Sequence, residues 1–377
     1  MRFPGFEGEW EIERNEHLFV VSKEKNKSGK YTSVLSASQS EGMVERSGLG
    51  IDIKYEEDSV LGYKVVHPGD YVIHLRSFQG GFAFSEKTGI CSPAYTILQP
   101  SSSLSYGFLK NYFVSKKFIN SLRIVTYGIR DGKSISVEEW LKLSTCFPKS
   151  LEEQQRIKSF LSLLDKRISL QNKVIEDLRA LKKAATTYLL ESHDGEKRTL
   201  GEITESFSLR NKSRIQYPMY SVTNDKGFIP QSEQFEDREM EGEDIAAYKL
   251  INNGDIAYNP ARINVGSIAQ YAGNETCMIS SLYVCVRAKK GISSKWLMHV
   301  LKSDNLLFYY NLYAEGGVRL YLFYPNFARI KVTVPSIEKQ EQIASSLDAI
   351  DNKLRNESSI LSGLLLQKES ILSRIFA

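Results

Sequence analysis

Apolar residues alternate four and three positions apart along two segments of the chain. In the first segment they are Ile157, Leu161, Leu164, Ile168, Ile175, Leu178, Ala185 and Leu189. In the second they are Ile343, Leu347, Ile350, Leu354, Leu361, Leu364, Ile371 and Ile375. This spacing predicts a long helix in each segment, with a coiled-coil seam along one face. A helix of about 40 residues would be roughly 60 Å long.

The two segments are copies of one pattern. SLEEQQRI begins at Ser150, and SIEKQEQI begins at Ser336. Polar residues interrupt the seam at the same two places in both copies. They are Gln171 and Lys182 in the first copy and Glu357 and Lys368 in the second. An accidental amphipathic helix would not repeat its interruptions, so the pattern indicates an internal repeat.

Each predicted helix has a recognisable start. Both begin shortly after a proline (Pro148 and Pro335), and Ser150 and Ser336 are the expected N-caps. Glu153 is placed to complete a capping box with Ser150, whereas Lys339 leaves the second box incomplete.

The blocks that precede the helices also correspond. GYKVVHPGDYVIHLRSFQGG, from Gly62, is similar to AYKLINNGDIAYNPARINVG, from Ala247. Both predict a strand, a Gly-Asp turn, a second strand and an arginine-bearing loop that ends in glycine. Further on, YGIRDGKSIS from Tyr127 corresponds to GGVRLYLFY from Gly316.

The predicted fold class is therefore α+β. We expect two β-rich domains separated by two long helices that form an antiparallel coiled coil, with a pseudo-two-fold internal repeat. The predicted boundaries are 1–148 for the first domain, 149–192 for the central helix, 193–335 for the second domain and 336–377 for the last helix. The alternative is two independent domains, each with its own unrelated amphipathic helix.

Composition narrows the function classes only slightly. The chain has 377 residues, 42% hydrophobic and 25% charged, which is typical of globular domains. A net charge of +4 permits a nucleic-acid partner without requiring one. The four cysteines form no CxxC pair, which predicts reduced thiols and a cytoplasmic location. No apolar run reaches the length of a membrane span, so no membrane association is expected.

Catalytic motifs are missing from the sequence. Adenine methyltransferases need an Asn/Asp-Pro-Pro-aromatic loop to hold a flipped base. The nearest string, Asn259-Pro260-Ala261-Arg262, lacks the second proline and the aromatic, and predicts only a turn before an arginine loop. The chain has no GxGxxG, GxxxxGK[ST], HxxxH or HExxH string. We therefore expect no catalytic residue and no metal ligand in this chain.

The candidate DNA-binding residues are polar and lie among glycines in corresponding loops. They are Arg76, Ser77, Gln79, Arg130 and Lys133 in the first half, and Arg262, Asn264, Arg319 and Tyr321 in the second. Arginine, lysine, asparagine and glutamine bind phosphates and base edges. The competing interpretation is an exposed arginine in a weak surface ion pair. The basic run Arg179, Lys182 and Lys183 likewise fits either a solvated helix face or a phosphate contact.

Taken together, these motifs resemble the specificity subunit of type I restriction–modification systems over essentially the whole chain. The resemblance rests on RFPGFEGEW near the N-terminus, on SLEEQQRI with the following LLDKRISLQNKVIEDLRALKKA, on PSIEKQEQIASSLDAIDNKL, and on TLGEI from Thr199. The first half departs from the family pattern, because EIERNEHLFVV stands where an LGEI-like phrase is usual.

The resemblance implies two target-recognition domains that each read half of a bipartite site in double-stranded DNA. It implies that the helices dock two methyltransferase (modification) subunits, and that restriction (motor-nuclease) subunits join the complex. S-adenosylmethionine, ATP and Mg would be bound by those partners and not by this chain. Two other hypotheses stay open: the recognition part of a fused restriction enzyme and methyltransferase, and a scaffold that has lost DNA binding.

Overall fold

The computed structural model describes residues 2–38, 41–46, 57–128, 132–191, 195–231 and 245–376. It confirms the α+β class, and the chain divides into two compact units. Unit 1 comprises Met1–Lys173 with Ser358–Ala377, and unit 2 comprises Val174–Glu357. Each unit therefore contains one β-rich body and a segment of each long helix.

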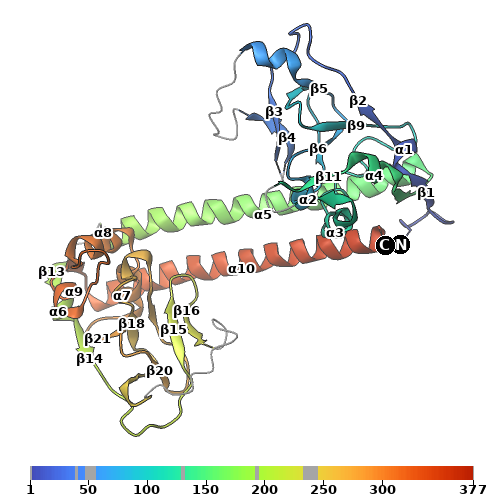
Figure 1. Cartoon of the computed structure of the whole chain (residues 1–377). Helices are drawn as coiled ribbons and strands as arrows, with labels where there is room; N and C mark the ends of the chain where they lie inside the picture. The colour runs from blue at the N-terminus through green and yellow to red at the C-terminus, as the bar shows by residue number, and fades with distance from the viewer. Residues whose placement is uncertain are drawn as a thin grey trace. The chain divides into compact units, whose positions relative to one another are not determined.

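Unit 1 is built on a four-stranded antiparallel sheet in the order β2-β9-β6-β7 (Figure 1). Strand pairs β1–β12, β3–β4, β5–β8 and β10–β11 surround it. The strands are β1 (Glu11–Arg14), β2 (Phe19–Ser22), β3 (Leu35–Ser38), β4 (Gly42–Glu45), β5 (Lys64–Val66), β6 (Tyr71–Ile73), β7 (Ala83–Phe84), β8 (Gly89–Cys91), β9 (Thr96–Pro100), β10 (Thr126–Tyr127), β11 (Ser134–Ile135) and β12 (Ser144–Phe147). The short helices are α1 (Asn15–Leu18), η2 (Glu57–Gly62), α2 (Ser77–Gly80), α3 (Lys116–Ser121), η3 (Leu122–Val125) and α4 (Val137–Lys142).

Unit 2 has the corresponding sheet, in the order β14-β21-β18-β19, with pairs β13–β22, β15–β16 and β17–β20. Its strands are β13 (Glu196–Thr199), β14 (Thr204–Phe207), β15 (Tyr220–Thr223), β16 (Gly227–Pro230), β17 (Lys249–Ile251), β18 (Ile256–Tyr258), β19 (Ile268–Gln270), β20 (Cys277–Ile279), β21 (Val284–Ala288) and β22 (Lys331–Val334). Its short helices are α6 (Leu200–Ile203), η6 (Ile245–Ala247), η7 (Ile263–Val265), α7 (Ser294–Leu301), α8 (Asp304–Tyr313) and α9 (Tyr324–Phe327).

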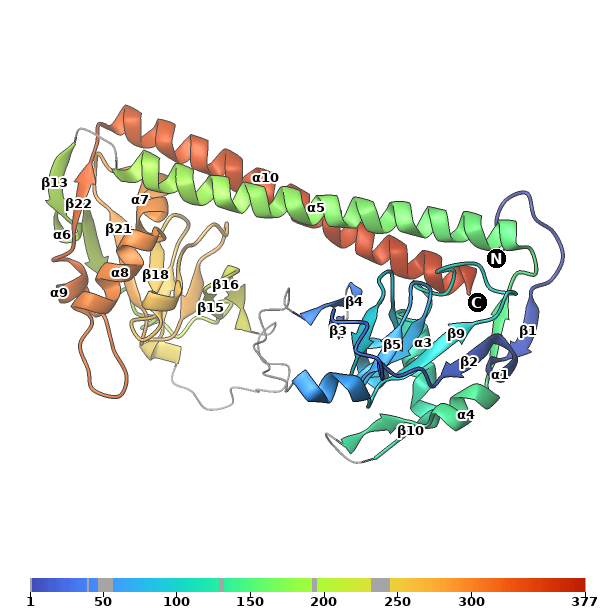
Figure 2. The ribbon, with the colours of Figure 1, turned by 90° about the horizontal axis from the view of Figure 1, so that it is seen from above.

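The N-terminal strand follows the same plan in both units, despite the unusual sequence of the first half. Glu11 of β1 pairs with Phe147 of β12, as Glu196 of β13 pairs with Val334 of β22. Helix α1 then occupies the place in unit 1 that α6, with the sequence LGEI, occupies in unit 2 (Figure 2). The departure from the family pattern therefore changes side chains and keeps the local fold.

The long helices are α5 (Leu151–Glu191) and α10 (Ile337–Ile375). Among the described residues, no helix is both long enough and apolar enough to span a membrane. The predicted seam residues are buried or half-buried. The first of them in each helix also belong to the core of the adjoining β-rich body. Ile157 and Leu161 lie in the core of unit 1, and Ile343 and Leu347 lie in the core of unit 2.

Two of the polar interruptions of the seam form matching ion pairs between the helix segments. Lys368 of α10 pairs with Asp165 of α5 at 2.6 Å in unit 1. Lys182 of α5 pairs with Asp351 of α10 at 2.5 Å in unit 2. In unit 1, Leu161 lies in one apolar cluster with Leu372 and Ile375 of α10. Asp165, one turn further along α5, pairs with Lys368, which comes earlier in α10, so the two segments run in opposite directions there. All four side chains are only half-buried, so each pair contributes modestly to stability and mainly helps to fix the register.

The start of α5 corrects one prediction. The Ser150 hydroxyl accepts a hydrogen bond from the Glu153 N–H at 3.3 Å, as an N-cap should. The Glu153 carboxylate does not accept the hydrogen bond from the Ser150 N–H that a capping box would contain. It pairs with Arg2 at 3.0 Å and accepts a hydrogen bond from the N–H of Phe3 at 3.2 Å. The predicted capping box is thus replaced by a buried anchor for the N-terminal segment.

A buried glutamine explains why the helix start is repeated. Gln154 accepts from the N–H of Ser105 at 2.7 Å and donates to the carbonyls of Ser103 and Pro148 at 2.8 and 2.9 Å. Gln340 accepts from Ser293 at 2.8 Å and donates to Pro335 at 2.9 Å. Both glutamines are essentially inaccessible to solvent. The same side chain therefore ties each long helix to the body that precedes it.

Replacing Gln154 with alanine should lower the free energy of unfolding by about 2–4 kcal/mol, because three buried backbone groups lose their partner. Gln340→Ala should cost less, about 1–3 kcal/mol, because two groups are affected. Urea denaturation of the full chain measures both. Gln155→Ala is the matched control, because Gln155 is exposed on the next helical position. Equal stability of the Gln154 and Gln155 variants would rule out this anchor.

Candidate nucleic-acid interface

In unit 1 the predicted contact loop follows strand β6. The N–H of Arg76 donates to Nδ1 of His74 at 3.3 Å, and the N–H of Ser77 donates to the His74 carbonyl at 3.0 Å. These bonds close a turn that leaves the side chains of Arg76 and Gln79 exposed. The loop ends at Gly81, whose φ of +76° and closeness to the Phe113 carbonyl leave no room for a side chain.

In unit 2 the corresponding loop follows strand β18 and has the same turn. Oδ1 of Asn259 accepts from the Ala261 N–H at 3.0 Å, and the Asn259 carbonyl accepts from the Arg262 N–H at 3.0 Å. Asn259 in unit 2 therefore accepts the same two turn-forming hydrogen bonds that His74 accepts in unit 1. Arg262 is exposed, while Asn264 is half-buried and donates to Oδ1 of Asn311 at 3.0 Å.

The strand register refines the predicted equivalences. Counted from β6 and β18, Gln79 corresponds to Asn264, but Arg262 corresponds to Ser77. The two arginines therefore lie in corresponding loops of the two units, at aligned positions that differ by one residue. Ser77 is fully buried, and its hydroxyl accepts from the N–H of His74 at 2.7 Å. We revise its predicted role accordingly, from a direct DNA contact to a support for the loop.

A second predicted loop lies next to the first in each unit. In unit 1, α2 contacts β11, which follows the exposed Lys133. Arg130 lies outside the described residues. In unit 2, the N–H of Leu322 donates to the carbonyl of Pro260 at 2.9 Å, which joins the segment of Arg319 and Tyr321 to the Arg262 loop. The fold thus brings together residues that are about 50 to 60 positions apart in sequence.

The side chains of this second loop are exposed in unit 2. Backbone hydrogen bonds between Glu315 and Tyr321, 2.9 and 2.8 Å long, close a hairpin with Arg319 near its tip. The Tyr321 ring stacks on Phe323 with centroids 5.9 Å apart. Within the described parts of the chain, no carboxylate pairs with Arg76, Lys133, Arg262 or Arg319. These cations are therefore available to an external anion.

Three of the four cysteines are buried. Burial raises the pKa of Cys91 and Cys277 to about 12 and that of Cys285 to about 11, so these thiols stay protonated and unreactive. No group of three His, Cys, Asp or Glu side chains is arranged to hold a metal among the residues that the structure describes.

Sequence reasoning missed a further group of cations. Lys197, Lys302 and Lys331 come from three separate segments and meet in unit 2 around one pocket, together with the predicted basic run of α5. Each lysine is isolated in the sequence, and no spacing pattern links them. Only the folding of unit 2 reveals the cluster.

Comparison with known proteins places this geometry in context. The family model described as type I restriction modification DNA specificity domain matches residues 193–365. The putative type I restriction enzyme MjaX specificity subunit of Methanocaldococcus jannaschii is 24% identical over 196 residues, which cover 48% of this chain and 45% of that protein. The match therefore spans less than half the length of that curated relative.

Two solved structures share the fold. One is the type I restriction–modification S subunit from M. genitalium. The match covers 100% of this chain and 99% of that chain, with a TM-score of 0.60 and 16% sequence identity. A chain from a study of complex assembly and conformational transition of the type I R-M system gives 98% coverage of both chains, a TM-score of 0.58 and 16% identity.

The contact loop of unit 1 should respond to pH through His74. Burial lowers the pKa of His74, and a hydrogen bond with the backbone of Gly81 offsets only part of this effect. The unfolded chain therefore binds the proton more readily. His74 contributes its full stabilisation above about pH 6.5 and loses it as the pH falls from there toward the folded-state value.

Urea denaturation at pH 7.5 and 5.5 tests this expectation. The loss of unfolding free energy on acidification should be smaller in His74→Gln than in the parent chain, because the variant lacks the titrating ring. His17→Gln is the control for the loss of a histidine in itself, since His17 is exposed, pairs only with Glu13 on the surface and lies outside the contact loop. The same pH response in the parent and in His74→Gln would contradict the assignment.

Proposed function

We propose that this chain is a type I restriction–modification DNA specificity subunit, supported by the specificity-domain match over residues 193–365, and that it recognises a bipartite sequence in double-stranded DNA. In this proposal each β-rich body is a target-recognition domain. One half-site is read by the loops of unit 1 and the other by the loops of unit 2. The chain itself is non-catalytic and acts in the cytoplasm, where the DNA is.

The observation that carries the proposal is the pair of corresponding loops with exposed arginines. Arg76 and Arg262 follow equivalent strands, sit on the same type of turn and have no carboxylate partner among the described residues. Glycines with positive φ end both loops, at Gly81 and Gly266, and allow close approach to a groove. An arginine can bind guanine through two hydrogen bonds in the major groove, which gives sequence discrimination.

The proposed role of the long helices is to space the two domains. We infer that α5 and α10 form an antiparallel coiled coil related by a pseudo-two-fold axis. The matching Lys182–Asp351 and Lys368–Asp165 ion pairs support this arrangement. The exposed faces of the helices would dock two methyltransferase subunits, with restriction subunits joining that complex. S-adenosylmethionine, ATP and Mg would be bound by those partners.

The buried glutamines give this proposal a mechanical basis. Gln154 and Gln340 fix each helix to its domain through several hydrogen bonds, so a domain cannot pivot freely on its helix. A defined spacing between half-sites needs that rigidity. Recognition would then combine base contacts in two loops with a separation set by the helices.

Arg76→Ala and Arg262→Ala should each weaken specific DNA binding by about 1–3 kcal/mol if the side chain makes a bidentate base contact. Each change should relax the sequence preference in only one half-site. Gel shifts of the full chain, alone and with its methyltransferase partner, measure the affinity, and mapping of methylated adenines measures the preference. Arg123→Ala serves as a control, because Arg123 is exposed on η3 outside both loops.

Unchanged affinity and unchanged preference in both variants would show that these loops do not read DNA. Methylation by the purified chain without a partner would favour the fused-enzyme hypothesis instead. A chain that binds the methyltransferase but no duplex would favour a scaffold that has lost DNA binding.

A second experiment tests the spacing role. Seven residues inserted after Ile168 and seven after Leu354 keep the heptad phase and lengthen the helices by about 10 Å. The spacer between half-sites should then grow by roughly three base pairs, at about 3.4 Å per pair. Methylome mapping reads the spacer directly. A folded, active variant that keeps the original spacer would refute the spacing role.

A further inference from the structure

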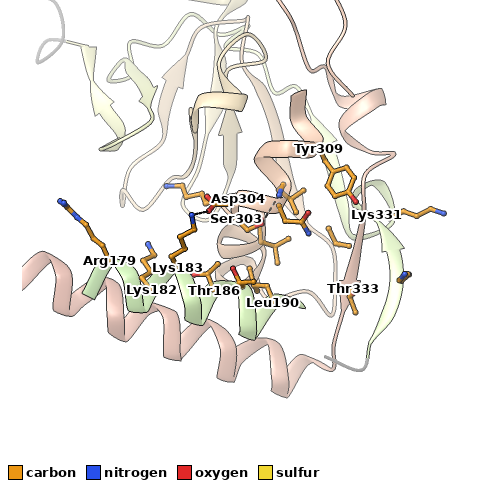
Figure 3. Close-up of a pocket in the computed structure, with 17 residues that line it drawn as sticks. Arg179, Lys182, Lys183, Thr186, Leu190, Ser303, Asp304, Tyr309, Lys331 and Thr333 are labelled. Atoms are coloured by element: carbon orange, nitrogen blue, oxygen red, sulfur yellow. Dashed lines mark hydrogen bonds and ion pairs between the residues drawn. The ribbon is translucent and has the colours of Figure 1, made fainter. Parts of the chain in front are cut away.

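Unit 2 contains a pocket of about 640 Å³ beside the C-terminal part of α5 (Figure 3). Its apolar lining residues are Leu190, Val300, Leu306 and Val332, and we call them the floor because the last three are buried. Figure 3 shows Lys183 and Leu190 of α5 on one side and Tyr309 of α8 on the other. A cavity of several hundred cubic ångströms with an apolar floor and polar edges is typical of small-molecule sites.

Cations dominate the edge of this pocket. The described lining includes six of them, which are Arg179, Lys182, Lys183, Lys197, Lys302 and Lys331, against one carboxylate, Asp304. Lys183 pairs with Asp304 at 3.4 Å, and Lys182 pairs with Asp351 at 2.5 Å. The other four have no ion-pair partner in the described part of the chain. The pocket therefore carries uncompensated positive charge.

Unit 1 shows what the fold itself requires at this place. Leu190 corresponds to Phe376 by the helix repeat. Val300 corresponds to Tyr112 by the register of β9 and β21 and by the matching Ser105–Gln154 and Ser293–Gln340 hydrogen bonds. In unit 1 these two rings stack with centroids 4.6 Å apart, and Phe376 belongs to the apolar core. The smaller side chains of unit 2 leave that space open. The pocket is therefore a feature of unit 2 and not a necessary consequence of the fold.

The charges differ in the same way. Four cations of the unit 2 pocket have uncharged counterparts in unit 1. Lys197 corresponds to Ile12, Lys302 to Val114, Lys331 to Ser144 and Arg179 to Leu365. Unit 1 folds with none of these four cations. The fold of the body therefore does not require the cation cluster of unit 2, whereas binding of a ligand would explain it.

Crowding of like charges also favours an anionic ligand. The Lys302 side chain reaches solvent, yet burial among neighbouring atoms lowers its pKa, and repulsion by Lys182 lowers it further. Asp351 opposes this only in part. An anion in the pocket would relieve the repulsion and stabilise the charged form of Lys302.

We propose that the unit 2 pocket binds the phosphate groups of a nucleotide, with the nucleoside lying over the apolar floor. Several phosphates match a rim of several lysines and an arginine. The Tyr309 ring and the apolar floor suit a planar base. A free nucleoside triphosphate and a nucleotide within a single strand share this chemistry. The site is separate from the arginine loops and does not depend on the DNA-reading role of the chain.

Fluorescence titration of the full chain with a methylanthraniloyl derivative of ATP tests the site. Saturable binding is expected, with displacement by unlabelled ATP and by inorganic triphosphate if the ligand is free. Displacement by a short oligothymidylate at much lower concentration than by ATP would assign the site to a nucleic-acid strand. The Lys302→Gln/Lys331→Gln double variant should weaken binding about tenfold or more, because two charge-assisted contacts are lost.

Two further variants separate the pocket from general charge. Lys290→Gln removes an exposed lysine of the same unit outside the pocket, and should bind as the parent chain does. Leu190→Phe introduces the ring found at this place in unit 1, and should abolish binding while every charge is kept. Thermal unfolding checks that each variant is folded. No saturable binding of any probe, or an equal loss in Lys290→Gln, would overturn the proposal.

Discussion

The structure depends on one constraint, which is the attachment of a long helix to a β-rich body through a buried amide. A helix of about 40 residues has little to hold it at its first turn except the groups that its own body offers. Gln154 and Gln340 supply both a donor and an acceptor there, and each binds backbone groups from separate segments of its body. Apolar packing of Ile157 and Ile343 follows one turn later. The repeated helix start therefore forms the same attachment between helix and body in both units.

Sequence patterns predicted those features that have a period or a repeat. The seam positions, the helix starts and the Gly-Asp turns all follow from spacing, and the residues take the expected places. Partners of single polar side chains could not be predicted. Glu153 turns to Arg2 and Phe3, which lie about 150 residues away in the chain. Ser77 turns inward because its hydroxyl accepts from His74, so it supports the loop that presents Arg76.

In the candidate DNA-binding loops, too, the repeated loop was predictable from the sequence and the places of single side chains were not. The sequence repeat predicts that Arg76 corresponds to Arg262, whereas the strand register sets their positions one residue apart. The loop is repeated, but its arginine is not at the same position, and the neighbouring side chains also differ. His74 accepts a hydrogen bond in one loop and Asn259 accepts it in the other. A turn of constant geometry with variable side chains is what two domains need if they are to read different half-sites. The cationic pocket of unit 2 is a second such difference, built where unit 1 has a closed aromatic core.

The most direct test of the account is the selection of binding sites from a pool of random duplexes by the full chain together with the proposed methyltransferase partner. If two corresponding units read DNA at a set separation, sequencing of the bound fraction will give two short blocks with a spacer of constant length. Each block will change independently when the loop of its own unit is altered. One contiguous block, two blocks with a variable spacer, or no enrichment over the starting pool would contradict the account.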